Sequence, residues 1–484
     1  MFSIRNNVLN FPLFFIKRGL GGVCVCLLLA GCSIGPKYVR PTAQIPAIYK
    51  EAKDWKKAHP QDEMIRGEWW KIFNNPQLDA LENQVNISNQ NIAVAEAQYA
   101  QAYALVQAAK SAIFPILGTS ASYTRSHGSS GGGGGASNSK SAVSSNLLNA
   151  DVSWELDLWG KIRRTIESNR AAAQASKADL ENARLSAQAQ LAQDYFQLCS
   201  LDAQKKLLDD TRVIYQKFLN LTKNQYASGV AAESAVIQAR TQLESTQAQV
   251  IDIGVQRSEM EHAIALLMGK PASEFSIPLM TLPNTVPTVP TGLPSEILER
   301  RPDIAAAERT VASANALIGV AEAAYFPTLT LSASGSYDSS NLANLFSSPN
   351  PLWSIGPALT ETIFDAGLRQ AQTSQAKAVY NQDVATYRQT VLTAFQQVED
   401  NLAALRILAE EEAIQDEAVK DAQKAVMLET NQYKAGTVSA LDVITTQATA
   451  LTNEKTDVTL LGERLNACVL LIEYLGGGWN ASQE

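Results

Sequence analysis

The chain of 484 residues contains the same phrase twice, and this duplication limits its fold more than any other feature. Residues 224–229 read NQYASG and residues 431–436 read NQYKAG, so five of six letters agree at a separation of 207 residues. The same separation relates LMG at 267–269 to YLG at 474–476. Self-similarity at a fixed spacing is typical of a repeated architecture. The duplication therefore predicts two halves that fold alike.

Both halves contain the same segments in the same order. A helical lead-in, at 77–112 or 303–325, precedes two short alternating segments and a long stretch rich in Ala and Gln. The NQY-xx-G phrase and a second helical stretch, at 234–268 or 439–475, follow. We assign 77–269 to the first repeat and 303–475 to the second. The Phe-Pro pairs at 114–115 and 326–327 are 212 residues apart, so the first half carries five extra residues, which match the glycine run at 131–135.

Four segments with an apolar residue at every second position predict β-strands. In 148–158 every even position is apolar and every odd position is polar, and 328–337 alternates almost as regularly. Alternation is weaker in 116–125 and in 352–364, where Glu361 falls on the apolar parity, which indicates a bulge or the end of the strand. At about 3.3 Å per residue, strands of about 10 residues match the thickness of a bilayer core.

Two very long helices are expected. Residues 160–226 contain no proline, and a helix of about 65 residues is about 100 Å long. Residues 367–433 are its counterpart. The return stretch 439–475 has apolar residues at alternating spacings of three and four, broken only at Lys455 and Gly462, which predicts a coiled-coil seam.

The duplicated phrase ends each long helix. Gly229 and Gly436 stand where a left-handed residue would stop it, and a new helix follows within a few residues. Each half is therefore expected to form an antiparallel helical hairpin with the phrase at its tip. Tyr226 and Tyr433 lie one turn before the stop, where the simplest role is packing within the hairpin.

Four strands with one apolar face cannot stand alone in hydrocarbon, because their two edges would leave backbone groups unpaired. Further copies of the chain would have to close the sheet into a barrel of 8, 12 or 16 strands. The fold class expected is mainly α with a membrane β-barrel, continued by long helices. A helical bundle without a membrane role would explain the helices but not the strands.

Residues 1–31 have the form of an export signal, with Lys17 and Arg18 before a short apolar run. The run ends in LAGC, which resembles the bacterial lipobox and predicts Cys32 as the lipidated, palmitate-bearing N-terminus. An ordinary signal peptide with an incidental cysteine is the alternative. Ser33 after the cysteine favours the outer membrane.

Composition argues against several other classes. The formal charge of -8 argues against a nucleic-acid partner. His59, His127 and His262 have no partners at catalytic or metal-binding spacing, so we expect no enzyme, no catalytic residue, no metal and no cofactor. In the mature chain only Cys199 and Cys468 accompany Cys32, and we expect two free thiols rather than a disulfide.

Six stretches together resemble the TolC-like outer membrane factors, within them the lipoprotein outer-membrane components of tripartite drug efflux pumps. They are LAGCSIGPKYVRP at 29–41, GEWWKIFNNPQLDALE at 67–82, ERRPDIAAAER at 299–309, AAYFPTLTLSASGSY at 323–337, FDAGLRQA at 364–371 and LGGGW at 475–479.

The resemblance implies a homotrimer, with a 12-stranded barrel in the outer membrane lipid and a periplasmic α-helical tunnel of 12 helices. It also implies docking to a periplasmic adaptor protein and an inner-membrane RND-type transporter. The function expected is a passive duct that exports drugs or other small molecules. A channel for type I protein secretion is the alternative. A periplasmic adaptor also has long hairpins, but the doubled hairpin and the strands argue against it.

The resemblance also completes the division of the chain. Residues 1–31 are the signal peptide and 32–76 the lipidated N-terminus with an equatorial segment. An equatorial linker at 270–302 separates the two repeats, and 476–484 form an equatorial tail.

Related channels carry two acidic residues, three apart, just after the second phrase. Asp442 matches the first, but Thr445 occupies the second position, and Val438 replaces a basic residue found in some members. Together with Tyr226 and Tyr433, Asp442 is a candidate periplasmic gate. A second reading is that Asp442 completes a capping box with Ser439.

Lipidation can be tested directly. Metabolic labelling with a radioactive fatty acid should mark the wild-type chain and should be lost in Cys32→Ser, because no other residue offers the lipobox thiol. Label that persists in the variant would contradict the assignment.

Overall fold

A computed structural model describes most of the mature chain. The signal peptide 1–31 and Cys32 lie outside the described residues, as do parts of the three segments predicted to be equatorial. The structure describes residues 33–46, 48–51, 67–127, 142–289, 300–347 and 351–478. The chain divides into two compact units. One unit comprises Met1–Lys37, Gln107–Glu167 and Asn315–Lys377, and the other comprises Tyr38–Val106, Ser168–Ala314 and Ala378–Glu484.

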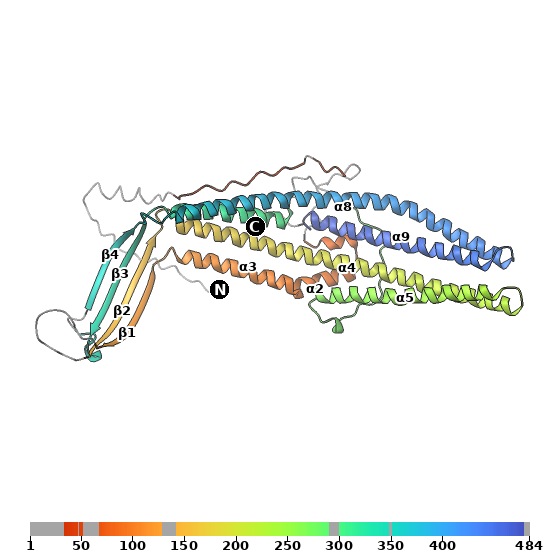
Figure 1. The fold of residues 1–484 in the computed structure, drawn as a ribbon, viewed down its shortest axis with the longest axis horizontal. Coiled ribbons are helices and arrows are strands. Elements are labelled where there is room, and N and C mark those ends of the chain that lie inside the picture. The colour runs from red at the N-terminus through yellow and green to blue at the C-terminus, as the bar shows by residue number, and fades with distance from the viewer. Residues whose placement is uncertain are drawn as a thin grey trace, which may run out of the picture. The chain divides into compact units, whose positions relative to one another are not determined.

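The first unit contains one antiparallel four-stranded sheet, in which the strands lie side by side in chain order (Figure 1). All four predicted strands are confirmed. They are β1 (Ile116–Ser126), β2 (Val143–Leu156), β3 (Thr328–Ser339) and β4 (Pro351–Thr360).

Glu361 lies directly after β4, so the strand's end, and not a bulge, explains its place on the apolar parity. Its carboxylate is 3.2 Å from the Arg369 guanidinium, which gives the charge a partner beyond the strand.

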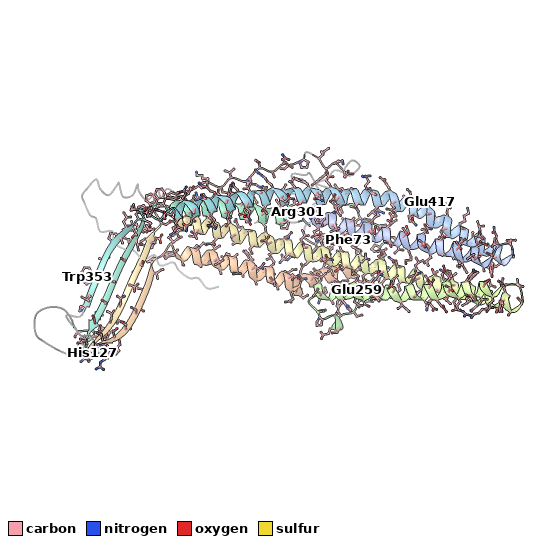
Figure 2. All side chains as sticks on the ribbon, in the orientation of Figure 1. Phe73, His127, Glu259, Arg301, Trp353 and Glu417 are labelled. Atoms are coloured by element: carbon pink, nitrogen blue, oxygen red, sulfur yellow. The ribbon has the colours of Figure 1, made fainter. Side chains whose placement is uncertain are left out.

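The register brings most of the apolar residues of the four strands onto one face. Trp154 lies opposite Leu331, Leu331 lies opposite Pro357, and Trp353 lies opposite Gly335. Trp353 is strongly exposed on β4, the last strand of the sheet (Figure 2). The opposite face carries mainly Ser, Thr, Asn and Asp side chains, with Leu147 and Leu352 among its apolar exceptions. In the described sheet, β1 and β4 each pair on one side only.

Short contacts tie the segment after Cys32 to the end of β2. The Ile34 N–H donates to the Trp159 carbonyl at 3.1 Å. The Arg164 guanidinium donates to the Ile34 carbonyl at 3.0 Å and to the Gly35 carbonyl at 3.1 Å. Because all three contacts use main-chain groups of Ile34 and Gly35, they fix the path of the segment close to the position where a lipid would be attached.

Four helices form the two hairpins, and they match the predicted stretches within one residue at each end. They are α4 (Lys161–Ala227), α5 (Glu233–Leu267), α8 (Leu368–Lys434) and α9 (Ala440–Tyr474). Helix α8 begins and ends 207 residues after α4, and α9 stands in the same relation to α5. Each long helix has 67 residues, contains no proline and extends about 100 Å.

The lead-in helices differ between the halves. In the second half a single helix, α7 (Pro302–Ala323), precedes the strands. In the first half the structure corrects the single stretch predicted at 77–112. It contains α2 (Pro76–Ser88) and α3 (Gln90–Ser111), separated at Asn89. The Asn89 side chain accepts from two N–H groups of α3 and donates to the Leu267 carbonyl, so it caps the second helix and ties it to α5.

The GEWWKIFNNPQ stretch builds the core of the second unit. The 3-10 helix η2 (Trp69–Phe73) buries both tryptophans, and Phe73 packs against Phe196 of α4 with ring centroids 4.7 Å apart (Figure 2). Asn75 then caps α2 by accepting from two of its first N–H groups. This resemblance motif is therefore a packing element in this chain.

Among the helices that the structure describes, none combines the length and the hydropathy needed to cross a membrane.

Both thiols of the second unit are free and buried, as the sequence predicted. Burial, reinforced for Cys199 by the charge of Asp202, raises the pKa of each thiol to about 12. Thiolate is therefore scarce at pH 8, and the side chains are inaccessible.

We expect iodoacetamide at pH 8 to leave Cys199 and Cys468 unmodified in the folded protein and to modify both in denaturant, as read by peptide mass spectrometry. A linked 199–468 peptide, or rapid labelling of the folded chain, would show that this packing is incorrect.

Candidate functional site

The candidate site lies where each long helix turns into its return helix. Gly229 and Gly436 have φ values of 74° and 78°, the left-handed conformation that glycine adopts most readily. In both turns the glycine N–H donates to the carbonyl of the preceding Tyr, Tyr226 or Tyr433, at 3.0 Å. The two turns therefore end their helices by the same backbone geometry.

The helices that follow the two turns begin differently. Helix α5 starts after Ala232, whose side chain makes no capping hydrogen bond. Helix α9 starts with a capping box between Ser439 and Asp442. The Ser439 N–H and hydroxyl donate to Asp442 Oδ2 at 2.9 and 2.7 Å, and the Asp442 N–H donates to the Ser439 hydroxyl at 3.4 Å. Only the second turn thus carries a capping carboxylate.

These hydrogen bonds lower the pKa of the Asp442 carboxyl, with the Ser439 hydroxyl as the largest cause. The side chain is exposed, and its charge is retained to a lower pH than that of an ordinary aspartate. The capping contribution is complete above the unfolded pKa and is lost as the pH falls through the lowered folded pKa. Thr445 is placed otherwise, because its hydroxyl donates to the Leu441 carbonyl of its own helix at 2.9 Å.

The two tyrosines of the duplicated phrase have different surroundings. Tyr433 is buried, its hydroxyl donates to the Gln225 side-chain carbonyl, and its ring lies 5.3 Å from that of Phe218. Both partners belong to α4, in the other hairpin. Tyr226, at the equivalent position, is 48% exposed. The structure therefore places one candidate gate residue between the hairpins and leaves the other on the surface.

A single apolar cluster joins the ends of the two hairpins. Its members are Tyr215, Phe218, Leu219, Val236, Ala239 and Leu243 from the first hairpin and Tyr433, Ala440, Val443 and Ile444 from the second. Val438, which stands where some related channels have a basic residue, packs against the same cluster.

Sequence reasoning missed Phe218 and Gln225, the two residues of α4 that contact Tyr433. The only available signal was that Gln225 belongs to the repeated phrase, and this signal did not indicate a partner in the other half.

The arrangement at the turns is suited to closing a passage by apolar packing and to acting on ions through a charged side chain. No group of three or more His, Cys, Asp or Glu that could hold a metal occurs in the described part of the chain. His127 follows β1 and His262 lies on α5, and the two residues belong to different compact units. What the turns offer is an exposed carboxylate held by its own helix beside a tightly packed apolar cluster.

Comparisons with known proteins agree on one family. The model for the family described as "Outer membrane efflux protein" matches residues 81–270 and 293–477. The pyoverdine export outer membrane protein OpmQ of Pseudomonas aeruginosa is 30% identical over 96% of this chain and 98% of its own. The toluene efflux pump outer membrane protein TtgC of Pseudomonas putida is 29% identical over 96% of both chains. Among solved structures, the outer-membrane channel OprN superposes with a TM-score of 0.84 at 30% identity, covering 93% of this chain and all of its own.

The apolar cluster can be tested at Phe218. Phe218→Ala removes the ring against which Tyr433 packs, and truncating a buried phenylalanine costs about 3 to 5 kcal/mol. We expect faster amide hydrogen exchange in the last turns of both α4 and α8, measured by mass spectrometry. The exposed residue Val230, in the same turn, provides the control Val230→Ala, which should leave the exchange unchanged. Faster exchange in α4 alone would show that the cluster does not join the two hairpins.

Proposed function

The chain belongs to the outer membrane efflux protein family, and on that premise we propose that it is the passive, trimeric outer-membrane duct of a tripartite efflux system. It is an outer membrane protein and not an enzyme. The cargo proposed is drugs or other small molecules, delivered through a periplasmic adaptor from an inner-membrane RND-type transporter.

The four-stranded sheet carries this proposal. Its apolar face includes exposed large side chains such as Leu117, Trp353 and Ile355. Within the part of the chain that the structure describes, the edge strands β1 and β4 have neighbours on one side only. In a bilayer such edges must be paired, because no water is present to satisfy the backbone groups. Three copies would supply 12 strands and pair β1 of each copy with β4 of the next. The polar face of Ser, Thr and Asp would then line the duct.

The N-terminal segment supports attachment of a lipid at the same level. Ile34 is hydrogen bonded to Trp159, three residues after the end of β2. A lipid on Cys32 would therefore lie within a few residues of the end of a membrane strand. The lipid and the barrel would then both anchor the protein at the same surface of the membrane, and each anchor would work without the other.

A passive duct agrees with the diversity of cargo among relatives. OpmQ is named for export of pyoverdine and TtgC for efflux of toluene, which are two different compounds. A wide channel lined by small polar side chains makes few specific contacts. Selection of cargo would then belong to the inner-membrane partner.

The periplasmic gate would lie at the hairpin turns. All the hydrogen bonds of the Asp442 carboxylate described above use Oδ2, so its other oxygen can face a pore while the cap is intact. Three copies of Asp442 would form a ring of negative charge. Tyr433 would hold the two hairpins of one chain together, and Tyr226 would contribute an exposed aromatic side chain.

Planar-bilayer recordings with purified protein test both the duct and the ring. Wild type should give long-lived, cation-preferring channels that divalent ions block, and native mass spectrometry should show a trimer. Asp442→Asn keeps the size and much of the capping ability of the residue and removes its charge, so cation preference should weaken and the block should disappear. Ser439→Ala is the matched control, because it weakens the cap and keeps the charge, and it should retain both properties.

The outcomes separate the two proposals. Absence of channels, or a dominant monomer, would overturn the duct. Channels of Asp442→Asn that match wild type in both properties would leave the duct standing and remove Asp442 from the gate.

A further inference from the structure

The polar face of the four-stranded sheet carries charge of one sign. Its charged residues, placed on this face by the register, are Asp151, Glu155 and Asp338. In the strands that the structure describes the one Lys or Arg is Arg125, and it lies on the apolar face near the end of β1. The polar face is therefore negative, and no cation of the strands offsets its charge.

The three carboxylates lie at different heights of the sheet, and two of them have a close partner. Asp338 lies at the end of β3 that leads to β4, and the Ser145 hydroxyl donates to its Oδ1 at 2.8 Å. Glu155 lies near the other end of the sheet, where the Lys161 ammonium is 3.8 Å from its carboxylate. Asp151 lies between these two levels, and its side chain is exposed. Asp151 is therefore the acidic residue best placed to act at the middle of the sheet.

The neighbours of Asp151 across the strands are small and uncharged. The Asn149 amide donates to Asp151 Oδ1 at 3.3 Å. A Cβ placed on Gly118 would lie 3.1 and 3.2 Å from the two carboxylate oxygens, so the carboxylate lies directly over a residue without a side chain. On the other side the register continues to Ser334 and Ser354, whose hydroxyls are 2.9 Å apart. We call Gly118, Asp151, Ser334 and Ser354 the Asp151 row, and Asp151 is its only charged member.

We propose that Asp151 gives the membrane part of the duct its preference for cations. This inference rests on the proposed trimer, in which the polar face lines the duct, and it assigns a second charge-selective residue besides Asp442. Three copies of the Asp151 row would form one closed belt in which the three Asp151 carboxylates are the only charges. Because the rest of the belt is small and neutral, these carboxylates face the water of the duct. Their field raises the local concentration of small cations and of cationic cargo and lowers that of anions.

Salt distinguishes the belt from the ring proposed at the hairpin turns. A barrel of more than about eight strands has more interior than its side chains fill, so ions pass the Asp151 belt at a distance. The Debye length is about 30 Å at about 0.01 M salt and about 3 Å at about 1 M, so such a field acts across the duct in dilute salt and is screened in concentrated salt. Block by divalent ions needs carboxylates close together and therefore stays with Asp442.

Reversal potentials in potassium chloride gradients across planar bilayers test the assignment. In salt of about 0.01 M, Asp151→Asn should lower the ratio of potassium to chloride permeability about twofold or more, and at about 1 M it should match wild type. Its divalent block should be unchanged. Ser334→Asp in the Asp151→Asn chain moves the charge one strand along the same row and should restore the ratio. Ser334→Asn is the neutral control and should leave the ratio at the wild-type value.

Each outcome bears on one proposal. Equal ratios for Asp151→Asn and wild type in dilute salt, in channels of protein that native mass spectrometry shows to be trimeric, would overturn the role of Asp151 and leave the duct intact. A lowered ratio that Ser334→Asp does not restore would also overturn it, because the loss would then come from local shape and not from charge. If Asp151→Asn does not assemble, Asp151→Ser repeats the measurement. Absence of channels from the wild-type chain would overturn the duct itself.

Discussion

The packing of the second hairpin onto α4 is the interaction on which the arrangement of the helices depends. Long helices without proline are stiff, and most of their stability in proteins comes from packing of their apolar stripes. Here α4 receives α9 at Ser200 and Gly462 and receives Tyr433 at Phe218 and Gln225. The first contact is close because both residues are small, and the second is specific because a buried hydroxyl has a single amide partner. Together they align one hairpin against the other at two levels.

The periodic features of the fold could be predicted from the sequence, because they depend on the spacing of residue types along the chain. The helix bounds, the parity of the strands and the cap between Ser439 and Asp442 all follow from spacing, as does the left-handed turn at each glycine. The partners of Tyr433 could not be predicted. Tyr226 and Tyr433 stand in nearly identical sequence stretches, and only the three-dimensional packing decides which of the two side chains is buried. The break at Asn89 was also missed, because an Asn between two helical patterns is a weak signal without the Leu267 carbonyl that it binds.

The hairpins of the two halves have helices of equal length and differ in a few side chains. Both turns use glycine in the same conformation, but only the second adds a carboxylate after it. Both return helices have 35 residues, but Gly462 of α9 is buried, whereas the equivalent residue of α5, Val255, is exposed. Duplication thus supplies the geometry twice, and divergence of single positions makes one turn charged and one helix surface apolar. A functional role assigned to one half therefore does not transfer to the other without inspection of its neighbours.

The equal lengths of the paired helices have a consequence for how such a gene can change. One residue inserted into α8 would rotate everything after it by about 100° and displace it by about 1.5 Å, so each later side chain would miss its counterpart on α4 or α9. The spacing of 207 residues holds from the start of α4 to the end of α9. It differs only ahead of the helices, where the Phe-Pro pairs are 212 residues apart. The difference in length between the two halves therefore falls between the Phe-Pro pairs and the long helices, where an extra residue rotates no packed helix.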